Sequence, residues 1–251
     1  MHHASTTPSY VERPRNLLQS RGRKSLNSSS QLIDILSIRL APGKIVHLEA
    51  YISYQGHGDV YTGAMGTFDV HGFSYLVKGQ SSSSQIWVIN KGNGESDNIN
   101  KIVSGWEVNP DIYGDSKTHF FIFWTVDGDD QTGCYNLNCL GFIPVNGAPI
   151  TPGDTLELPQ GQTRISLKIY KSRDDGDWWL YYGNDNIGFT RVGYWPKNLF
   201  YTLSDNATLI GWGGMTTSYK RHASPPMGNG NFAGRISAMV AVKFGPMDYH
   251  G

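Results

Sequence analysis

The sequence predicts an all-β protein, an antiparallel curved β-sandwich with one short helix. The first observation behind this fold class is composition. The 251 residues include 30 Gly, 14 Tyr and 7 Trp but only 17% charged residues, which is typical of turn-rich β proteins and not of helical bundles. The second is patterning, because from Ile45 onward short segments are bounded by Gly, Asn and Asp. A chain of this length can bury a sizeable core.

The N-terminal part of the chain differs from the rest. Residues 1–31 are rich in Ser, Arg, Asn and Gln and show no periodicity, which predicts a flexible arm. Residues 32–40 (LIDILSIRL) alternate weakly and could form a strand. We therefore divide the chain into a flexible arm or propeptide remnant over residues 1–45 and a β-sandwich domain over residues 46–251.

Three later segments have the alternation of strands. Residues 119–126 (HFFIFWTV) carry apolar side chains on both faces, so we expect a strand that lies inside the structure, between layers. Residues 163–171 and 235–244 alternate apolar and polar side chains, as half-exposed antiparallel strands do.

One hairpin and one helix are also predicted. The sequence DDGD at residues 174–177 favours a hairpin turn between the strand ending at residue 171 and a strand at residues 178–182. Residues 196–203 (PKNLFYTL) are the helix candidate, because Pro196 stands in the first turn and the apolar residues share one face.

Charge and hydropathy exclude several functions. Lys plus Arg and Asp plus Glu are both 21, so the formal net charge is zero and there is no field to attract a polyanion. We expect no nucleic-acid partner. No run approaches the ~18–20 apolar residues of a membrane span, so we expect no membrane partner. The first residues are polar, and no signal peptide is visible in them.

Among the acidic residues Glu107 is the candidate for chemistry. It follows Trp106 and precedes Val108, and in a strand these two neighbours would share the face opposite to Glu107. A carboxylate enclosed by aromatic side chains loses solvation, and its pKa rises towards values useful in acid–base catalysis. The alternative is an exposed Glu on a solvated strand face.

The two cysteines, Cys134 and Cys139, are five positions apart. They are either two free thiols or a local disulfide across a tight turn. No second Cys or His pair stands nearby to complete four ligands, and no His pair has metal-binding spacing, so we expect neither a metal nor a cofactor.

Several motifs together resemble the neprosin family of plant glutamic peptidases. They are GWEVNPDIYGD at residues 105–115, TGCYNLNC at 132–139, GYWP at 193–196, GWGGM at 211–215 and MGNGNF at 227–232. The resemblance implies a β-sandwich and a secreted prolyl endopeptidase that is active in acid. We expect the protein to be a monomer. It also implies that Cys134 and Cys139 form a disulfide.

In this family two glutamates face each other across a groove. One carboxylate activates a water and the other, protonated, polarises the scissile carbonyl, so the pair shares a proton. The resemblance implies Glu107 as the first glutamate, with Asp111 as the alternative. The second belongs in a WGGE motif, which here ends in Met215.

Met215 puts the activity in doubt, because a thioether can neither hold a charge nor donate a proton. Losing one of two cooperating catalytic groups costs several orders of magnitude in rate. We therefore expect a glutamic endopeptidase fold that is impaired or inactive. The alternative is a non-catalytic module that binds proline-rich or cell-wall polypeptides or carbohydrate.

Aromatic residues could form the groove for a proline-containing polypeptide, the expected partner, because indole and phenol rings stack on proline. The candidates are Trp106, Tyr194, Trp195 and Trp212. The alternative places the tryptophans in the core of the sandwich. Tyr135 and Asn136 could supply donors near the first carboxylate, although turn formation explains them equally well.

Overall fold

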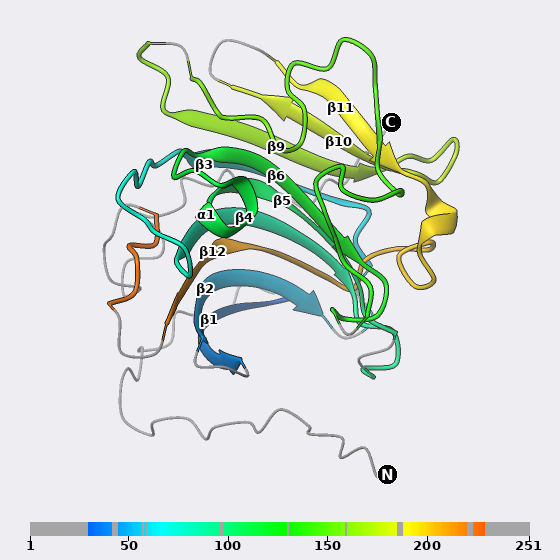
Figure 1. Ribbon diagram of the computed structural model, residues 1–251. Coiled ribbons are helices and arrows are strands. Elements are labelled where there is room, and N and C mark those ends of the chain that lie inside the picture. The colour runs from blue at the N-terminus through cyan, green and yellow to red at the C-terminus, as the bar shows by residue number, and fades with distance from the viewer. Residues whose placement is uncertain are drawn as a thin grey trace, which may run out of the picture.

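The computed structural model describes residues 30–41, 45–56, 58, 60–95, 98–129, 131–158, 160–184, 188–219 and 223–228. These residues form two antiparallel sheets stacked on one another, with one short α-helix at the side (Figure 1). The predicted all-β sandwich with one short helix is confirmed.

The larger sheet has seven strands and arches, with its concave side turned away from the second sheet (Figure 1). Its strands in spatial order are β1 (Ser30–Ala41), β2 (Ile45–Gly56), β12 (Leu209–Tyr219), β4 (Ser81–Asn90), β5 (Asn100–Val108), β6 (His119–Thr125) and β7 (Cys134–Tyr135).

The smaller sheet has five strands and covers the other side of the first. Its strands in spatial order are β3 (Gly63–Asp69), β9 (Arg164–Lys171), β10 (Trp178–Gly183), β11 (Thr190–Trp195) and β8 (Ile143–Pro144).

The core lies between the sheets, because alternate side chains of each strand point inward. Its largest fully buried side chains are Trp106, Trp178, Trp195, Phe68, Phe120, Ile86, Ile102, Ile122, Ile165, Leu167, Ile169 and Leu180. The indole nitrogen of Trp178 donates a hydrogen bond of 2.8 Å to the carbonyl of Leu203, which removes the cost of burying that polar group.

The hairpin and the first strand follow the sequence. β9 and β10 pair on either side of residues 172–177, so the predicted hairpin is confirmed. β1 pairs along its whole length with β2, so the sheet begins upstream of residue 46. The segment at 235–244 lies outside the described residues.

Two predictions need correction. The strand at 119–126 is β6, and only one of its two apolar faces packs between the layers. The side chain of Phe121 is buried as expected, but it lies on the concave face and not between the layers. The helix expected at 196–203 is only a 3-10 turn over Lys197–Leu199. Phe200 is extended (φ −109°, ψ 149°), so the helix cannot continue. The α-helix is α1 (Pro110–Tyr113), in the NPDIYGD motif.

In the described part of the chain, no helix has the length and apolar character to span a membrane.

Candidate functional site

Glu107 lies on the concave face of the seven-stranded sheet. Its neighbours Trp106 and Val108 are fully buried in the core, so the alternation of β5 turns Glu107 to the other side. The side chain is nevertheless only 4% exposed. The expectation that Glu107 points into the concave side is confirmed, and the alternative of a solvated strand face is wrong.

Both carboxylate oxygens of Glu107 have hydrogen-bond partners. The hydroxyl of Tyr113 donates to Oε1 at 2.8 Å, and the amide of Asn109 donates to Oε2 at 3.4 Å. Burial raises the pKa of Glu107 from an ordinary 4.5 to about 7, and the hydrogen bonds from Tyr113 and Asn109 and the charge of His119 act in the opposite direction. Glu107 is thus neutral in acid and titrates near neutrality.

Helix α1 brings Tyr113 over Glu107. Pro110 opens the helix, where its missing N–H costs nothing. Gly114 ends it with φ 77°, a left-handed conformation that suits glycine, and donates to the carbonyl of Pro110 at 3.1 Å. The ring of Tyr113 stacks on that of His119, with centroids 3.9 Å apart and planes 3° apart. One turn of helix therefore fixes the partner of the acid.

Asn136 fixes the same hydroxyl from the other side. Its Nδ2 donates to the Tyr113 hydroxyl at 3.1 Å, and its Oδ1 accepts from the backbone N–H of Ile122 at 3.1 Å. Asn136 has φ 53°, a conformation that Asn tolerates better than most residues. Together Glu107, Tyr113, Asn109 and Asn136 form the Glu107 network.

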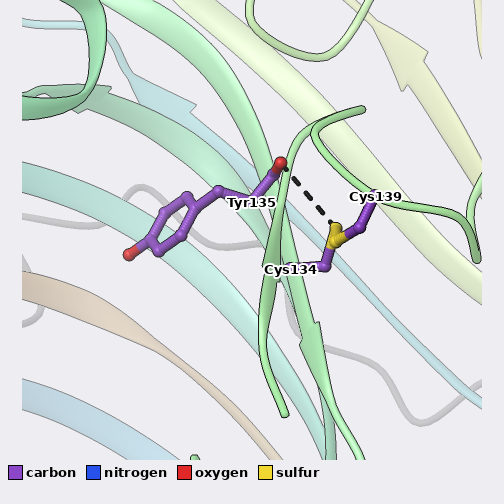
Figure 2. The surroundings of a disulfide bond; sticks show 3 residues. All are labelled: Cys134, Tyr135 and Cys139. Carbon is purple, nitrogen blue, oxygen red and sulfur yellow. Dashed lines mark hydrogen bonds between the residues drawn. A yellow bond between two sulfur atoms is a disulfide. The ribbon is translucent and has the colours of Figure 1, made fainter.

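A disulfide closes the turn that carries Asn136. Cys134 and Cys139 are bonded, with Cα atoms 6.0 Å apart. In Figure 2 the side chain of Tyr135 extends away from the sulfur atoms. The disulfide implied by the resemblance is confirmed in the structure.

Met215 lies in register with Glu107. On β12 it pairs with Ser83 of β4, and Ser83 pairs with Glu107 of β5. Because adjacent strands are about 4.8 Å apart, the Cα atoms of Met215 and Glu107 are about 10 Å apart. Cross-strand partners share a face, so the structure brings both predicted site residues to the concave side, with only a serine between them.

No second carboxylate completes a proton-sharing pair with Glu107 among the described residues. The raised pKa of Glu107 has burial as its cause, and no Asp or Glu contributes to it. On the far side of Met215 the register partner is Glu49 of β2, three strands from Glu107. At about 14 Å along the sheet, Glu49 is too distant to share a proton with Glu107.

Asp111, the alternative first carboxylate, has a different setting. It is exposed, and its Oδ2 accepts a hydrogen bond of 2.7 Å from the backbone N–H of Gly79. Its carboxylate therefore holds the loop before β4 against α1. It takes no part in the Glu107 network.

The aromatic groove predicted from the sequence is wrong. Trp106, Trp195 and Trp212 are at most 2% exposed and pack in the core between the sheets. Tyr194 is partly exposed, but its ring contacts that of Trp179, with centroids 4.7 Å apart, on the outward face of the five-stranded sheet. The three tryptophans point into the core, and Tyr194 belongs to the other sheet. The sequence did not settle these orientations, and none of the four residues lies on the concave face.

Other aromatic side chains occupy the concave face. Tyr51 of β2 and Trp87 of β4 meet edge to face at 5.6 Å, and both are partly exposed. Tyr135 packs on Phe123 at 4.8 Å and on Phe121 at 6.2 Å. The sequence signal for Trp87 was its alternation with the buried Ile86 and Val88.

Two glycines, Gly213 and Gly105, lie on the concave face between these aromatic pairs, and we call this side-chain-free part of the sheet the glycine floor. The register places Gly213, Gln85 and Gly105 side by side across β12, β4 and β5. A Cβ would meet the Ala50 carbonyl at 2.2 Å at Gly213, and the Ser84 carbonyl at 2.1 Å at Gly105. Only glycine fits at either position, so Gln85 is the one side chain that rises from this row of three.

The Glu107 network includes two residues that were not predicted from the sequence, Asn109 and, with a recognisable sequence signal, Tyr113. It stands six positions after Glu107 in the NPDIYGD motif, beyond a proline and before a glycine, which is the signature of a one-turn helix. In the described ranges no three His, Cys, Asp or Glu side chains come together in a way that could hold a metal ion.

Comparison with known families agrees with the motifs. A family model described as Neprosin matches residues 78–243, which is about two thirds of the chain. The matched range begins before β4 and includes the Glu107 network, the disulfide and Met215.

Proposed function

The chain belongs to the neprosin family, and from this premise we propose that it uses the peptidase fold of that family to bind a polypeptide without efficiently cutting it. The ligand in this proposal is an extended, proline-containing segment that lies on the concave face. Hydrolysis is impaired or absent.

The observation that carries the proposal is the burial and the hydrogen bonding of Glu107 on that face. A general acid or base must reach the substrate or an attacking water. Glu107 is 4% exposed, and Tyr113 and Asn109 already donate to its two oxygens. Met215, at the position of the second glutamate, supplies no ionisable group. Without a cooperating pair, several orders of magnitude in rate are lost.

The aromatic pair Tyr51 and Trp87 supports a proline-containing ligand. Proline-rich segments dock in grooves lined by aromatic rings, because they are already extended and lose little entropy on binding. Both rings are partly exposed and lie beside the glycine floor at Gly213.

The proposal places the protein outside the cell, as the family resemblance implies, and treats it as a monomer. The Cys134–Cys139 disulfide supports an extracellular setting, because such bonds persist in oxidising compartments.

The test compares binding and cleavage of one proline-rich polypeptide at pH 4. We expect wild type to bind it, measured by calorimetry, and to leave it intact, measured by mass spectrometry. Trp87→Ala removes a stacking surface and should weaken binding about tenfold. Trp179→Ala, on the other sheet, is the matched control and should leave this binding unchanged.

Two further variants test the loss of activity. Cleavage by Met215→Glu, absent from wild type and lost again when Glu107→Gln is added, would identify the missing carboxylate as the defect. Strong cleavage by wild type that Glu107→Gln abolishes would overturn the proposal.

A further inference from the structure

The loop that leads into β12 carries a motif that the concave face does not use. Residues 206–208 read Asn-Ala-Thr, which is the acceptor pattern for N-glycosylation, an Asn followed two positions later by Ser or Thr with no Pro between them. The sequence contains this pattern twice, and the other copy begins at Asn27, outside the described residues. Asn206 is the copy that belongs to the described part of the sandwich.

Main-chain hydrogen bonds anchor this loop. The side-chain amide of Asn90 donates to the carbonyls of Thr202 and Asn206, at 3.0 and 2.7 Å, so one group holds both ends of the loop. Ala207 exchanges two backbone hydrogen bonds with Tyr61, at 2.8 and 2.9 Å. These contacts fix the position of the loop without using the side chain of Asn206.

The side chain of Asn206 is accordingly available for modification. Asn206 is partly exposed, although the next residue, Ala207, is fully buried. Among the residues that the structure describes, the side-chain amide of Asn206 makes no hydrogen bond. A sugar attached to its nitrogen would therefore break no hydrogen bond of the described fold.

The loop lies at the end of the large sheet opposite to the Glu107 network. It packs where β4 ends at Asn90 and β5 begins at Asn100, whose Oδ1 accepts a hydrogen bond of 2.9 Å from the backbone N–H of Thr202. Glu107 is seven residues further along β5, which is about 23 Å of strand. In Figure 1 the loop is the yellow-to-orange segment that leads into β12 at the edge of the molecule. A bulky polar group is tolerated at such a place.

We infer that Asn206 is an N-glycosylation site, modified while the chain passes through the secretory pathway. The inference rests on the extracellular placement in the proposed function, because acceptor patterns of this kind are used in secreted chains. It does not depend on the proposed peptide binding.

The modification needs an oligosaccharide donor, here one carried on a lipid diphosphate. The Nδ2 atom of Asn206 forms a bond to the anomeric carbon of the first sugar. The bond from that carbon to the diphosphate oxygen breaks, the lipid diphosphate leaves with the electron pair, and the amide gives up one proton to a base of the modifying enzyme. Nothing is oxidised or reduced in this transfer.

The test expresses the full chain behind a secretion leader in eukaryotic cells and maps its peptides by mass spectrometry. The leader ensures entry into the pathway, and the readout needs no ligand, so this inference and the proposed peptide binding fail separately. We expect the peptide that contains Asn206 to carry an oligosaccharide, and enzymatic release of that oligosaccharide to leave an aspartate at this position.

Variants of the motif separate its parts. Asn206→Gln should lose the oligosaccharide and stay folded by circular dichroism, because its main-chain carbonyl remains to accept from Asn90. Thr208→Ser keeps the hydroxyl that accepts a hydrogen bond of 3.1 Å from the backbone N–H of Lys91, and should remain glycosylated. Thr208→Val should lose the oligosaccharide although Asn206 is unchanged. Asn27→Gln, at the other copy, is the matched control and should leave Asn206 modified.

Two outcomes would overturn the inference. One is an unmodified Asn206 in wild type that is secreted and folded. The other is an oligosaccharide on Asn206 that Thr208→Val retains, because the attachment would then not follow the acceptor pattern.

Discussion

The outward faces of the two sheets differ in how their charged side chains are exposed and bonded. On the concave face of the seven-stranded sheet, the carboxyl of Glu107 is 4% exposed and hydrogen-bonded to Tyr113 and Asn109. On the five-stranded sheet, Arg191 is exposed and lies on an aromatic ring. The first charge belongs to the internal bonding of the fold, whereas the second is offered to solvent.

The difference shows why a residue type does not define a site. Helix α1 and the turn at Asn136 cover Glu107. Its carboxyl is therefore neutral through much of the acidic range and has few hydrogen bonds left for a substrate. A cation held by rings alone keeps its donors for a ligand. Four sets of variants test this contrast between the faces, in order of expected effect.

The comparison of the two outer faces assumes that Trp106 lies in the core between the sheets and not on either face. Trp106→Ala should therefore lower the free energy of unfolding by about 4 kcal/mol, because a fully buried indole leaves a cavity. Denaturation in urea measures this loss. Tyr194→Ala, at the one predicted groove residue outside the core, removes a partly exposed ring and should cost far less. Equal losses would mean that Trp106 is not a core residue.

Glu107→Gln tests the buried acid. In wild type the carboxyl has a pKa of about 7 in the folded state and 4.5 in the unfolded state. Stability should be highest below pH 4.5 and fall by about 3 kcal/mol as the pH rises through 7, since a tenfold difference in proton affinity is worth about 1.4 kcal/mol. The Gln variant should lack this fall.

Urea unfolding at pH 4, 6 and 8.5 measures this difference. Glu95→Gln, in an exposed loop, is the control and should follow wild type at each pH. A Glu107→Gln profile parallel to that of wild type would place the carboxyl in solvent and remove the contrast between the faces.

Cys134→Ala with Cys139→Ala tests the turn that covers the acid. Opening so small a loop should cost about 2 kcal/mol by the chain-entropy relation. Because Asn136 lies inside the loop, the pH-dependent fall in stability assigned to Glu107 should also change. Reduced wild type should match the double variant, and a double variant as stable as oxidised wild type would show that the bond does not support the network.

Tyr113→Phe has the smallest expected effect. It removes the hydroxyl that donates to Glu107 and accepts from Asn136, at a cost of about 1 kcal/mol. The loss should grow above pH 7, where the carboxylate needs the donor more, and the pKa of Glu107 should rise further in an NMR titration of its side-chain carbonyl. Tyr75→Phe, on an exposed ring, should change neither quantity.

The local features of the site could be predicted from the sequence. The alternation of Trp106, Glu107 and Val108 is enough to place the acid opposite its neighbours, because the side-chain period of a strand is two. The DDGD turn similarly predicted the hairpin of β9 and β10. The motifs indicated the family and the cysteine pair.

The groove could not be predicted in the same way. Trp195 and Trp212 have neighbours that allow either orientation, and only the stacking of the second sheet decides which side of each strand is buried. Tyr194 shows the same limit, since it proved to lie on the far sheet. The register of β12, β4 and β5, which places Ser83 between Met215 and Glu107, depends on strands far apart in the chain.

By itself, the sequence determined the fold class, the family, the direction of Glu107 and the loss of an ionisable group at Met215. These depend on the period of a strand and on the chemistry of single side chains. Only the tertiary structure decided that Tyr113 and Asn136 enclose the acid, and that aromatic and cationic residues gather on the opposite sheet. Such groupings depend on how strands, turns and the one helix pair and pack, and on which face each sheet turns to the core, and the pattern of a single strand does not encode these.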